Sequence, residues 1–400
     1  MKRAQRWFIA LVFGWMAFSP NHATAQLTPS DNPFPLLPGL EQPVEFWKKI
    51  FTEHSISQLV FFDPLDMSKI YEVLDVGEES RSDRYIDGER ARVAAAHEVD
   101  IDRVKVQRGI KERTAAGLKR ANRFLAQMQQ IFRERGVPVE LTYLPLIESS
   151  YNIAARSHAG ALGMWQFMPR TARQFLRVSR SIDERKDPIE STRAAATFLK
   201  QAHDSLGNWP LAITAYNFGP SGMARAVAEV GSDDLVEVIQ KYDHPRWGYP
   251  PKNFYAEFLA AVEIGKNIDQ YFPGLELDEP VAIQEVALRG NASLAAVMKS
   301  TGLKRDEFLE WNPALAGSRM IPAGYRVKLP VDRKMAAIVE VRQAPARQQS
   351  SVLRHRVKRG ETVVHIAKRY GTSPERIIRI NRISKVKLLR IGSTLLIPRL

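Results

Sequence analysis

Residues 90–268 constrain the fold more than any other part of this chain, because their apolar side chains recur at helical spacing without an alternating strand pattern. Gly136 ends the first helical stretch, at residues 90–135, and Pro138 opens the next helix. We therefore expect a mainly α fold. Five large apolar residues of the first stretch fall near the 3.6-residue period: Leu118, Phe124, Leu125, Met128 and Phe132.

The second half of this region carries explicit helix boundaries. Asp187 precedes Pro188 and Glu190 in the order typical of an N-cap, a first helical turn and a capping box. Leu206-Gly207 then ends the helix. The spacing predicts two further helices, at residues 211–217 and 257–268.

After residue 280 the pattern changes to short strands and short helices. We expect two small α+β modules of β-α-α-β order at 281–330 and 354–399, the first divergent, joined by a polar linker over 331–353. The first module predicts a strand at 281–288, helices at 294–301 and 305–311, and a strand at 325–329. The second repeats that order at residues 355–357, 366–370, 374–381 and 395–398.

Residues 1–25 have the three parts of a secretory signal: a basic start, an apolar run from Trp7 to Phe18, and Ala23-Thr24-Ala25 as a cleavage site. The run is shorter than the roughly 20 residues of a membrane span. We therefore expect export and cleavage, with an uncleaved N-terminal anchor as the alternative. Residues 26–115 are expected to form an extension, Pro-rich at first and then mostly helical, with an apolar packing patch at 58–64 and a loop at 74–87.

Cysteine is absent from the sequence. We therefore expect no disulfide, no thiol catalysis, no cysteine-held metal and no lipid-modified N-terminal cysteine. His158 and His203 lack the spacing of a metal site. The expected protein has no metal and no cofactor.

Positive charge is concentrated in the last module. The chain carries a net charge of +14, and residues 351–400 hold thirteen Lys and Arg against two acidic residues. A basic patch of this density favours a polyanionic partner. Because the N-terminal signal predicts export, we expect a carboxylate-bearing cell-wall polymer and no nucleic acid.

Glu148 is the strongest candidate for chemistry. It follows an apolar run at residues 143–147. Apolar surroundings and a helix C-terminus both raise the pKa of a carboxyl group, and a raised pKa suits a general acid near neutral pH. Trp165 and Tyr151 offer flat ring faces to a sugar, and Gln166 offers an amide that would position it.

Three short motifs occur in order: Glu148-Ser149, Gly163-Met164-Trp165-Gln166 and Ala215-Tyr216-Asn217. Together they resemble the signature of the family 1 lytic transglycosylases, whose catalytic domain has a lysozyme-like, goose-type helical fold. The resemblance implies such a domain over residues 116–275. It also implies that the two β-α-α-β units are LysM modules, which bind glycan.

The resemblance further implies cleavage of the β-1,4 bond between MurNAc and GlcNAc of peptidoglycan, with formation of 1,6-anhydro-MurNAc. Glu148 would be general acid and then general base, Asn217 would orient the acetamido group, and Tyr255 would form a hydrogen bond near Glu148. Substrate binding is implied for Ser149, Met164, Trp165, Gln166, Tyr216, Asn217 and Tyr255. Glycan binding in the second LysM module is implied for Gly360, Glu361 and Thr362.

Two alternatives remain open. A muramidase- or chitinase-type hydrolase on the same scaffold would need a second carboxylate, and no Asp or Glu lies between Glu148 and Asp183. A non-catalytic wall-binding protein would use the helical domain as a platform. In every case we expect a periplasmic protein whose partner is the peptidoglycan glycan strand and which has no membrane span after signal cleavage.

Overall fold

The computed structural model describes residues 32–77, 82–331, 352–370, 372–381, 383 and 389–398. The chain divides into two compact units, the first ending at Val281 and including Pro313–Gly317, and the second holding the remainder. The signal predicted at 1–25 and most of the linker predicted at 331–353 lie outside the described residues. Among the described residues, no helix is both long and apolar enough to cross a membrane.

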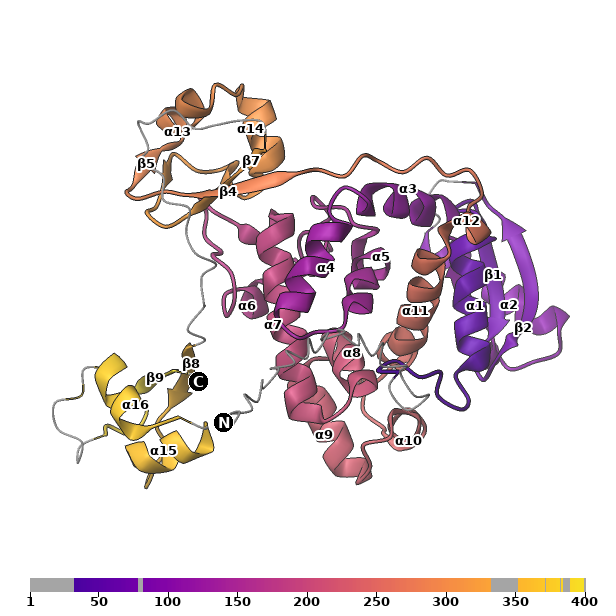
Figure 1. Cartoon of the computed structure of the whole chain (residues 1–400). Helices are drawn as coiled ribbons and strands as arrows, with labels where there is room; N and C mark the ends of the chain where they lie inside the picture. Colours follow the sequence, from indigo (N-terminus) through magenta and orange to yellow (C-terminus); the bar gives the residue numbers. More distant parts are fainter. Residues whose placement is uncertain are drawn as a thin grey trace, which may run out of the picture. The chain divides into compact units, whose positions relative to one another are not determined.

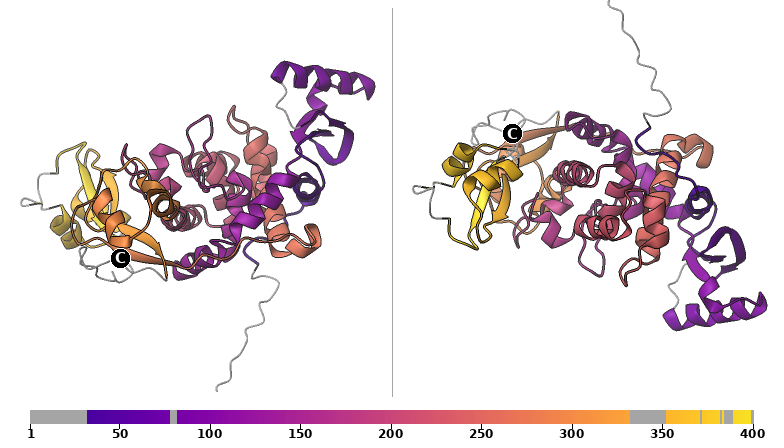
Figure 2. Two further views of the ribbon diagram at one scale, coloured as in Figure 1. Left: turned by 90° about the horizontal axis from the view of Figure 1, so that it is seen from above. Right: turned by 90° about the horizontal axis from the view of Figure 1, so that it is seen from below.

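The N-terminal part of the first unit contains an antiparallel sheet that the sequence analysis did not predict. Its strands lie in the order β2-β1-β3, and Val60 of β1 pairs with Val73 and Gln107 on either side. The sheet and α2 project from the helical body on the side of α1 (Figure 2). The elements are α1 (Glu41–Thr52), β1 (Gln58–Asp63), β2 (Asp66–Asp75), α2 (Asp83–Ala96), η2 (Ile101–Arg103) and β3 (Lys105–Arg108).

The expectation that the extension is mostly helical after its Pro-rich start is wrong. The apolar patch at 58–64 packs in the core, as expected, but it forms the central strand β1, whose side chains are buried on both faces, so no alternation marks it in the sequence. The helical stretch expected at 90–135 is broken by β3, because Gly109 donates its N–H to Gln58 at 3.0 Å and continues the sheet. Of the loop expected at 74–87, residues 74–75 lie in β2 and residues 83–87 lie in α2, whereas residues 78–81 lie outside the described residues.

The helical body agrees with the expected mainly α fold (Figure 1). Its centre is α8, which has a fully buried stretch at residues 211–213 and contacts both α7 and α11. The N-terminal α1 also contacts α11, so the extension is part of the first unit. The helices are α3 (Lys111–Ala121), α4 (Leu125–Glu134), η3 (Val139–Tyr143), α5 (Leu144–Ser149), α6 (Pro169–Ala172), η4 (Glu184–Lys186), α7 (Pro188–Leu206), α8 (Trp209–Phe218), α9 (Pro220–Val230), α10 (Leu235–Lys241), α11 (Tyr249–Lys266) and α12 (Ile268–Tyr271).

The predicted helix boundaries of α7 are confirmed. Asp187 accepts hydrogen bonds from the N–H groups of Ile189 and Glu190, both at 3.0 Å, which satisfies two donors that the helix leaves open. Gly207 ends the helix in the left-handed conformation. Because Asn208 caps α8 immediately afterwards, the two helices are joined by a tight turn.

The second unit contains the two predicted β-α-α-β modules. In each, the first and last strands pair antiparallel over five residues. The first module comprises β4 (Ile283–Ala287), β5 (Ala292–Ser293), α13 (Leu294–Thr301), α14 (Arg305–Trp311), β6 (Met320–Ile321) and β7 (Arg326–Pro330). The second comprises β8 (Val352–Arg356), α15 (Val363–Arg369), α16 (Pro374–Ile380) and β9 (Thr394–Pro398).

An asparagine after the second helix of each module ties that helix to the last strand. In the first module, Asn312 donates to Lys328 O at 2.8 Å and accepts from Lys328 N at 2.9 Å. In the second, Asn381 donates to Leu396 O at 2.6 Å and accepts from Leu396 N at 2.7 Å. The same pair of bonds at the same position shows that the divergent first module keeps the architecture of the second.

We predict that Asn381→Ala loosens the second module locally. The substitution leaves the N–H and carbonyl of Leu396 without partners, which costs about 1–3 kcal/mol. Hydrogen exchange measured by mass spectrometry should show faster exchange over 352–398 and unchanged exchange over 281–330. Asn312→Ala is the matched control and should reverse that pattern, whereas wild-type exchange in Asn381→Ala would contradict the role of the bridge.

Candidate active site

Glu148 lies near the C-terminal end of the six-residue helix α5, as predicted. The helix ends sharply because Ser150 and Tyr151 both adopt left-handed backbone conformations, with φ of 50° and 55°. Glu148 remains partly accessible, and within the described part of the chain its carboxyl group makes no ion pair and no hydrogen bond. Burial raises its pKa to about 8. The carboxyl group is therefore largely protonated at neutral pH, as a general acid requires.

The turn that follows α5 is held against it by side chain to backbone bonds. Ser149 Oγ donates to the carbonyl of Met164 at 2.7 Å. Gly163 has a φ of 81°, and a Cβ atom there would collide with the carbonyl oxygen of Arg185, so only glycine fits. Gln166, with a φ of 46°, donates to Gly163 O at 2.7 Å. The side-chain amide of Gln166, which was predicted to position a sugar, is therefore hydrogen-bonded within the turn.

The expectation that Trp165 and Tyr151 present ring faces to a sugar is wrong. Trp165 is fully buried, stacks on Phe132 at 5.8 Å with an interplanar angle of 12°, and donates from Nε1 to Thr192 at 3.0 Å. Tyr151 is also buried, and its hydroxyl donates to the carbonyl of Thr142 at 2.8 Å. Met164 is fully buried as well. These side chains are core residues that fix the backbone around Glu148.

The structure brings Tyr216 to Glu148. The Tyr216 hydroxyl donates to the carbonyl of Trp165 at 2.7 Å. Burial, together with the charge of Glu148, holds the pKa of Tyr216 well above its usual range, so this phenol remains neutral. Asn217, the next residue, is exposed near the end of α8.

Tyr255 does not form the hydrogen bond expected near Glu148. Its hydroxyl donates to the carbonyl of Pro35 at 2.9 Å, in the Pro-rich arm that precedes α1. The neighbouring Phe34 packs edge-on against Phe258, with ring centroids 5.1 Å apart. Tyr255 therefore anchors the arm to α11, a contact that spans 220 residues of sequence and that no local pattern indicates.

Sequence reasoning missed Glu257, two residues after Tyr255. Burial first, and then the charge of Glu148, raise the pKa of Glu257 to about 8. Glu257 lies on α11, which contacts α5. Its position within an otherwise apolar face of a predicted helix was the available signal: Phe254, Phe258 and Ala261 flank it and are buried.

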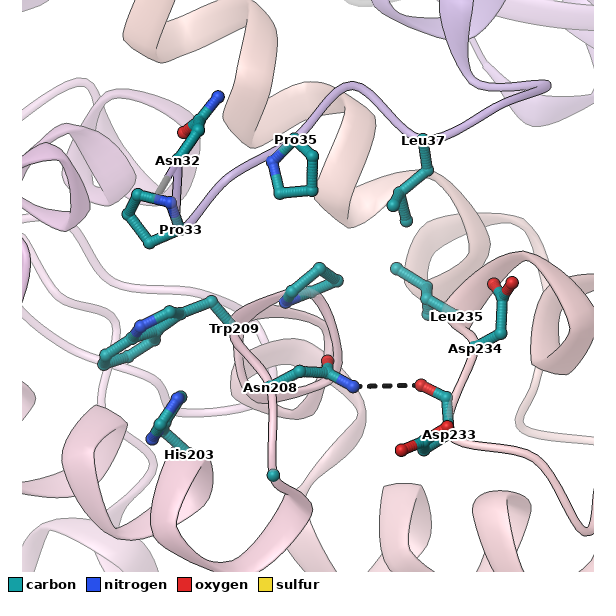
Figure 3. Close-up of a pocket in the computed structure, with 12 residues that line it drawn as sticks. Asn32, Pro33, Pro35, Leu37, His203, Asn208, Trp209, Asp233, Asp234 and Leu235 are labelled. Carbon is teal, nitrogen blue, oxygen red and sulfur yellow. Dashed lines mark hydrogen bonds between the residues drawn. The ribbon is translucent and has the colours of Figure 1, made fainter. Parts of the chain in front are cut away.

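A pocket of about 460 Å³ lies apart from these residues, beneath the Pro-rich arm (Figure 3). The arm covers the start of α8 and the start of α10 there. Asn208 donates across it to the carbonyl of Asp233 at 2.9 Å. Since neither Glu148 nor Glu257 lines it, this pocket is distinct from the candidate active site. Its lining includes Asn32, Pro33, Pro35, Leu37, His203, Trp209, Asp234 and Leu235.

The three glycan-binding candidates of the second module have structural partners. Glu361 accepts hydrogen bonds from Lys358 N at 2.8 Å and Arg369 at 2.8 Å, and lies 2.6 Å from His355 Nε2. Thr362 caps α15, and Gly360 has a φ of 83°. These bonds give the opening turn of the second module its shape.

No group of three or more His, Cys, Asp or Glu side chains that suits a metal ion occurs among the described residues.

Two family models match the chain. Residues 128–238 match the model described as Transglycosylase SLT domain, and residues 355–398 match the LysM domain. The chain contains an SLT domain and a LysM domain. Both matches lie inside the ranges predicted from sequence, 116–275 and 354–399.

The chain is also similar to named proteins. Membrane-bound lytic murein transglycosylase D of Escherichia coli strain K12 is 28% identical over 281 residues, which is 64% of this chain and 59% of that protein. A putative tributyltin chloride resistance protein of Alteromonas sp. strain M-1 is 39% identical over 113 residues, or 28% of this chain and 55% of that protein. The chain thus spans less than two thirds of each relative, and its homology to the first is distant.

Two solved structures give partial matches. The first is an inactive mutant of lytic transglycosylase Slt from Pseudomonas aeruginosa, with 23% identity, a TM-score of 0.31 and coverage of 38% of this chain and 25% of that one. The second is the 70 kDa soluble lytic transglycosylase of Escherichia coli, with 16% identity, a TM-score of 0.31 and coverage of 49% and 32%.

We predict that Glu148→Gln stabilises the protein as the pH rises. An unfolded chain loses the Glu148 proton near its ordinary pKa of about 4.5, whereas the folded protein keeps it until about pH 8. The free energy of unfolding of the wild type therefore falls as the pH rises from about 4.5 to about 8, whereas Glu148→Gln lacks this contribution. Urea unfolding should show equal stability at about pH 4 and a gain of roughly 1–3 kcal/mol for Glu148→Gln at about pH 7.

Glu263→Gln on α11 is a control of opposite sign. Despite partial burial, hydrogen bonds from Tyr271 and Lys48 lower the pKa of Glu263, so this variant should lose stability relative to wild type as the pH rises. A stability difference between Glu148→Gln and wild type that does not change with pH would contradict the raised pKa.

Proposed function

We propose that this protein is a peptidoglycan lytic transglycosylase that acts in the cell envelope, in the periplasm. The observation that carries the proposal is Glu148: a partly accessible carboxyl group, protonated at neutral pH by burial alone, within the SLT domain. Homology to a lytic murein transglycosylase supports lyase chemistry. The LysM domain supports peptidoglycan as the partner.

The proposed reaction uses one acid twice. Glu148 donates its proton to the glycosidic oxygen between MurNAc and GlcNAc, and the bond from C1 to that oxygen breaks. The carbonyl oxygen of the substrate's acetamido group stabilises the positive charge at C1. The Glu148 carboxylate then removes the proton of the 6-hydroxyl group as O6 bonds to C1. Glu148 regains its proton, the product is 1,6-anhydro-MurNAc, and no water is added.

Neighbouring residues have distinct proposed roles. Asn217, exposed one residue after Tyr216, orients the acetamido group. Tyr216 binds substrate from beside Glu148 while its hydroxyl holds the Trp165 carbonyl. Ser149 and Gln166 keep the turn in place through Met164 O and Gly163 O.

A hydrolase is the second candidate, and Glu257 is the observation that favours it. Glycoside hydrolysis ordinarily uses two carboxyl groups, and Glu257 supplies a second one that is electrostatically coupled to Glu148. In a hydrolase, Glu257 would activate a water molecule and the product would have a reducing end.

We predict that muropeptides released from purified sacculi are lighter by one water than hydrolysis products and resist borohydride reduction. Glu148→Gln should release none of them, because the amide cannot donate the proton. Mass analysis of the soluble fraction is the measurement. Reducible products would instead establish the hydrolase, and sacculus binding without any product from the wild type would indicate a non-catalytic wall-binding protein.

We predict that charge contributes to wall binding by the LysM domain. Lys358 and Arg359 are exposed on the opening turn of the second module. Replacing both with Ala should weaken binding to sacculi roughly threefold at low salt, since the polymer is anionic. Co-sedimentation measures this, and the difference should shrink above about 0.5 M salt. Val364→Ala, at a neutral exposed site on the same module, should bind as wild type; a loss equal to that of the double variant would contradict the charge model.

A further inference from the structure

The pocket beneath the Pro-rich arm lies apart from the candidate active site and has the size of a small-molecule site. Its volume is about 460 Å³, and pockets for small ligands typically measure roughly 300–1,000 Å³. Residues of three segments line it: the arm, the turn from α7 into α8, and the residues that open α10 (Figure 3). Its shape therefore depends on how these distant segments pack in the first unit.

The arm that roofs the pocket is held in place by its own contacts. Phe34 is buried and packs against the rings of Trp209 at 6.0 Å and Phe258 at 5.1 Å. The carbonyl of Pro35 accepts a hydrogen bond from the Tyr255 hydroxyl at 2.9 Å. Since the arm is already ordered on the protein, a ligand does not have to order it, and a preorganised site binds more tightly for the same contacts.

One side of the pocket is aromatic. Figure 3 shows Trp209 and His203 together there, and their rings stack with centroids 4.2 Å apart and an interplanar angle of 30°. Both residues remain partly accessible. Pro33, Pro35 and Leu37 add apolar surface from the arm. This surface suits an apolar stem, and an indole ring attracts a cation more strongly than the other aromatic side chains do.

The other side of the pocket is acidic. Asp233 and Asp234 line it there and are exposed (Figure 3). Asp234 accepts a hydrogen bond from Val236 N at 2.7 Å as the N-cap of α10. Within the described part of the chain, no lysine or arginine forms an ion pair with either aspartate, and none lines the pocket. Two carboxylates are therefore available to a cationic ligand.

The sign of its charge distinguishes this pocket from the chain as a whole. The chain carries a net charge of +14 and favours anionic partners, whereas the pocket contains two acidic residues and no lysine or arginine among its described lining. A concave site lined by charges of one sign concentrates ions of the opposite sign. The pocket therefore favours a cation, unlike the basic second LysM module.

We propose that this pocket is a second binding site, which takes a primary ammonium group carried on an apolar stem. Asp233 and Asp234 bind the ammonium group, and Trp209 and the prolines of the arm contact the stem. A lysine-like side chain has this chemistry: a compact cation on a flexible four-carbon stem. In the cell envelope, a wall peptide with a free diamino-acid side chain presents it, and so does a soluble diamine. Only the wall-peptide source rests on the proposed function.

The test is a titration of the full chain with Nα-acetyl-lysine amide. The indole N–H resonance of Trp209, identified by its absence in Trp209→Phe, reports binding. Nα-acetyl-norleucine amide is the matched probe, because it keeps the stem and lacks the ammonium group. The lysine probe should bind with roughly millimolar affinity, since exposed ion pairs are weak. The norleucine probe should bind about tenfold more weakly, because it lacks both the ion pairs and the attraction of the indole ring.

Asp233→Asn combined with Asp234→Asn removes both charges, and asparagine still caps α10. This double variant should bind the lysine probe about tenfold more weakly at low salt, and its difference from wild type should shrink above about 0.5 M salt. It should keep the wild-type affinity for the norleucine probe, which shows that the pocket is intact. Asp269→Asn combined with Glu276→Gln removes the same charge at exposed positions outside the lining and should bind both probes as wild type does.

Three results would overturn the inference. The first is equal binding of the two probes to wild type, or no binding of either. The second is wild-type affinity for the lysine probe in the double aspartate variant. The third is loss of both probes in that variant, because the aspartates would then shape the pocket and would not bind the ammonium group.

Muropeptide monomers distinguish the two sources of the ligand. Their free amine should shift the Trp209 resonance, and acetylation of that amine should abolish the shift. If only the small lysine probe shifts the resonance, the ligand is a soluble amine and the assignment to wall peptides fails. None of these readouts requires turnover, so reducible products from sacculi would remove the lyase proposal and leave this test unchanged.

Discussion

The site depends on a carboxyl group that is buried without a compensating charge. Water would stabilise the ionised form of Glu148, but burial removes much of that water, and among the described residues no cation pairs with the carboxyl group. The acid is thereby kept protonated where an ordinary glutamate is ionised. Burial of this carboxyl group lowers the stability of the folded protein at pH values above the ordinary pKa of a glutamate. Other interactions therefore have to hold the geometry around Glu148.

Hydrogen bonds from side chains to backbone carbonyl groups fix much of this geometry. Ser149 binds Met164 O, and Tyr216 binds Trp165 O. The apolar side chains of these two acceptors face the core, which leaves their main chain as the part that meets the site. The motif residues therefore hold the main chain in place beside Glu148, and their buried side chains are not exposed to solvent.

The two small modules share their internal hydrogen bonds but differ at their surface turns. Asn312 and Asn381 make equivalent bonds to the last strand, so the fold is retained in both. The opening turns differ: Asn291 accepts from Ala323 N in the first module, whereas Glu361 contacts two side chains and a backbone N–H in the second. A module can therefore change its surface while its helix-to-strand bridge stays in place.

The sequence alone determined the helices with local boundary signals, such as α7 between Asp187 and Gly207, the order of both β-α-α-β modules, and the identity of Glu148. These features rest on interactions between residues close in the chain. Only the tertiary structure decided that β1 is a central strand, that Trp165 is core, that Tyr255 binds the arm at Pro35, and that α11, which carries Glu257, contacts α5, which carries Glu148. Each of these depends on which distant segments pack together, because burial and charge coupling are properties of the neighbours in space.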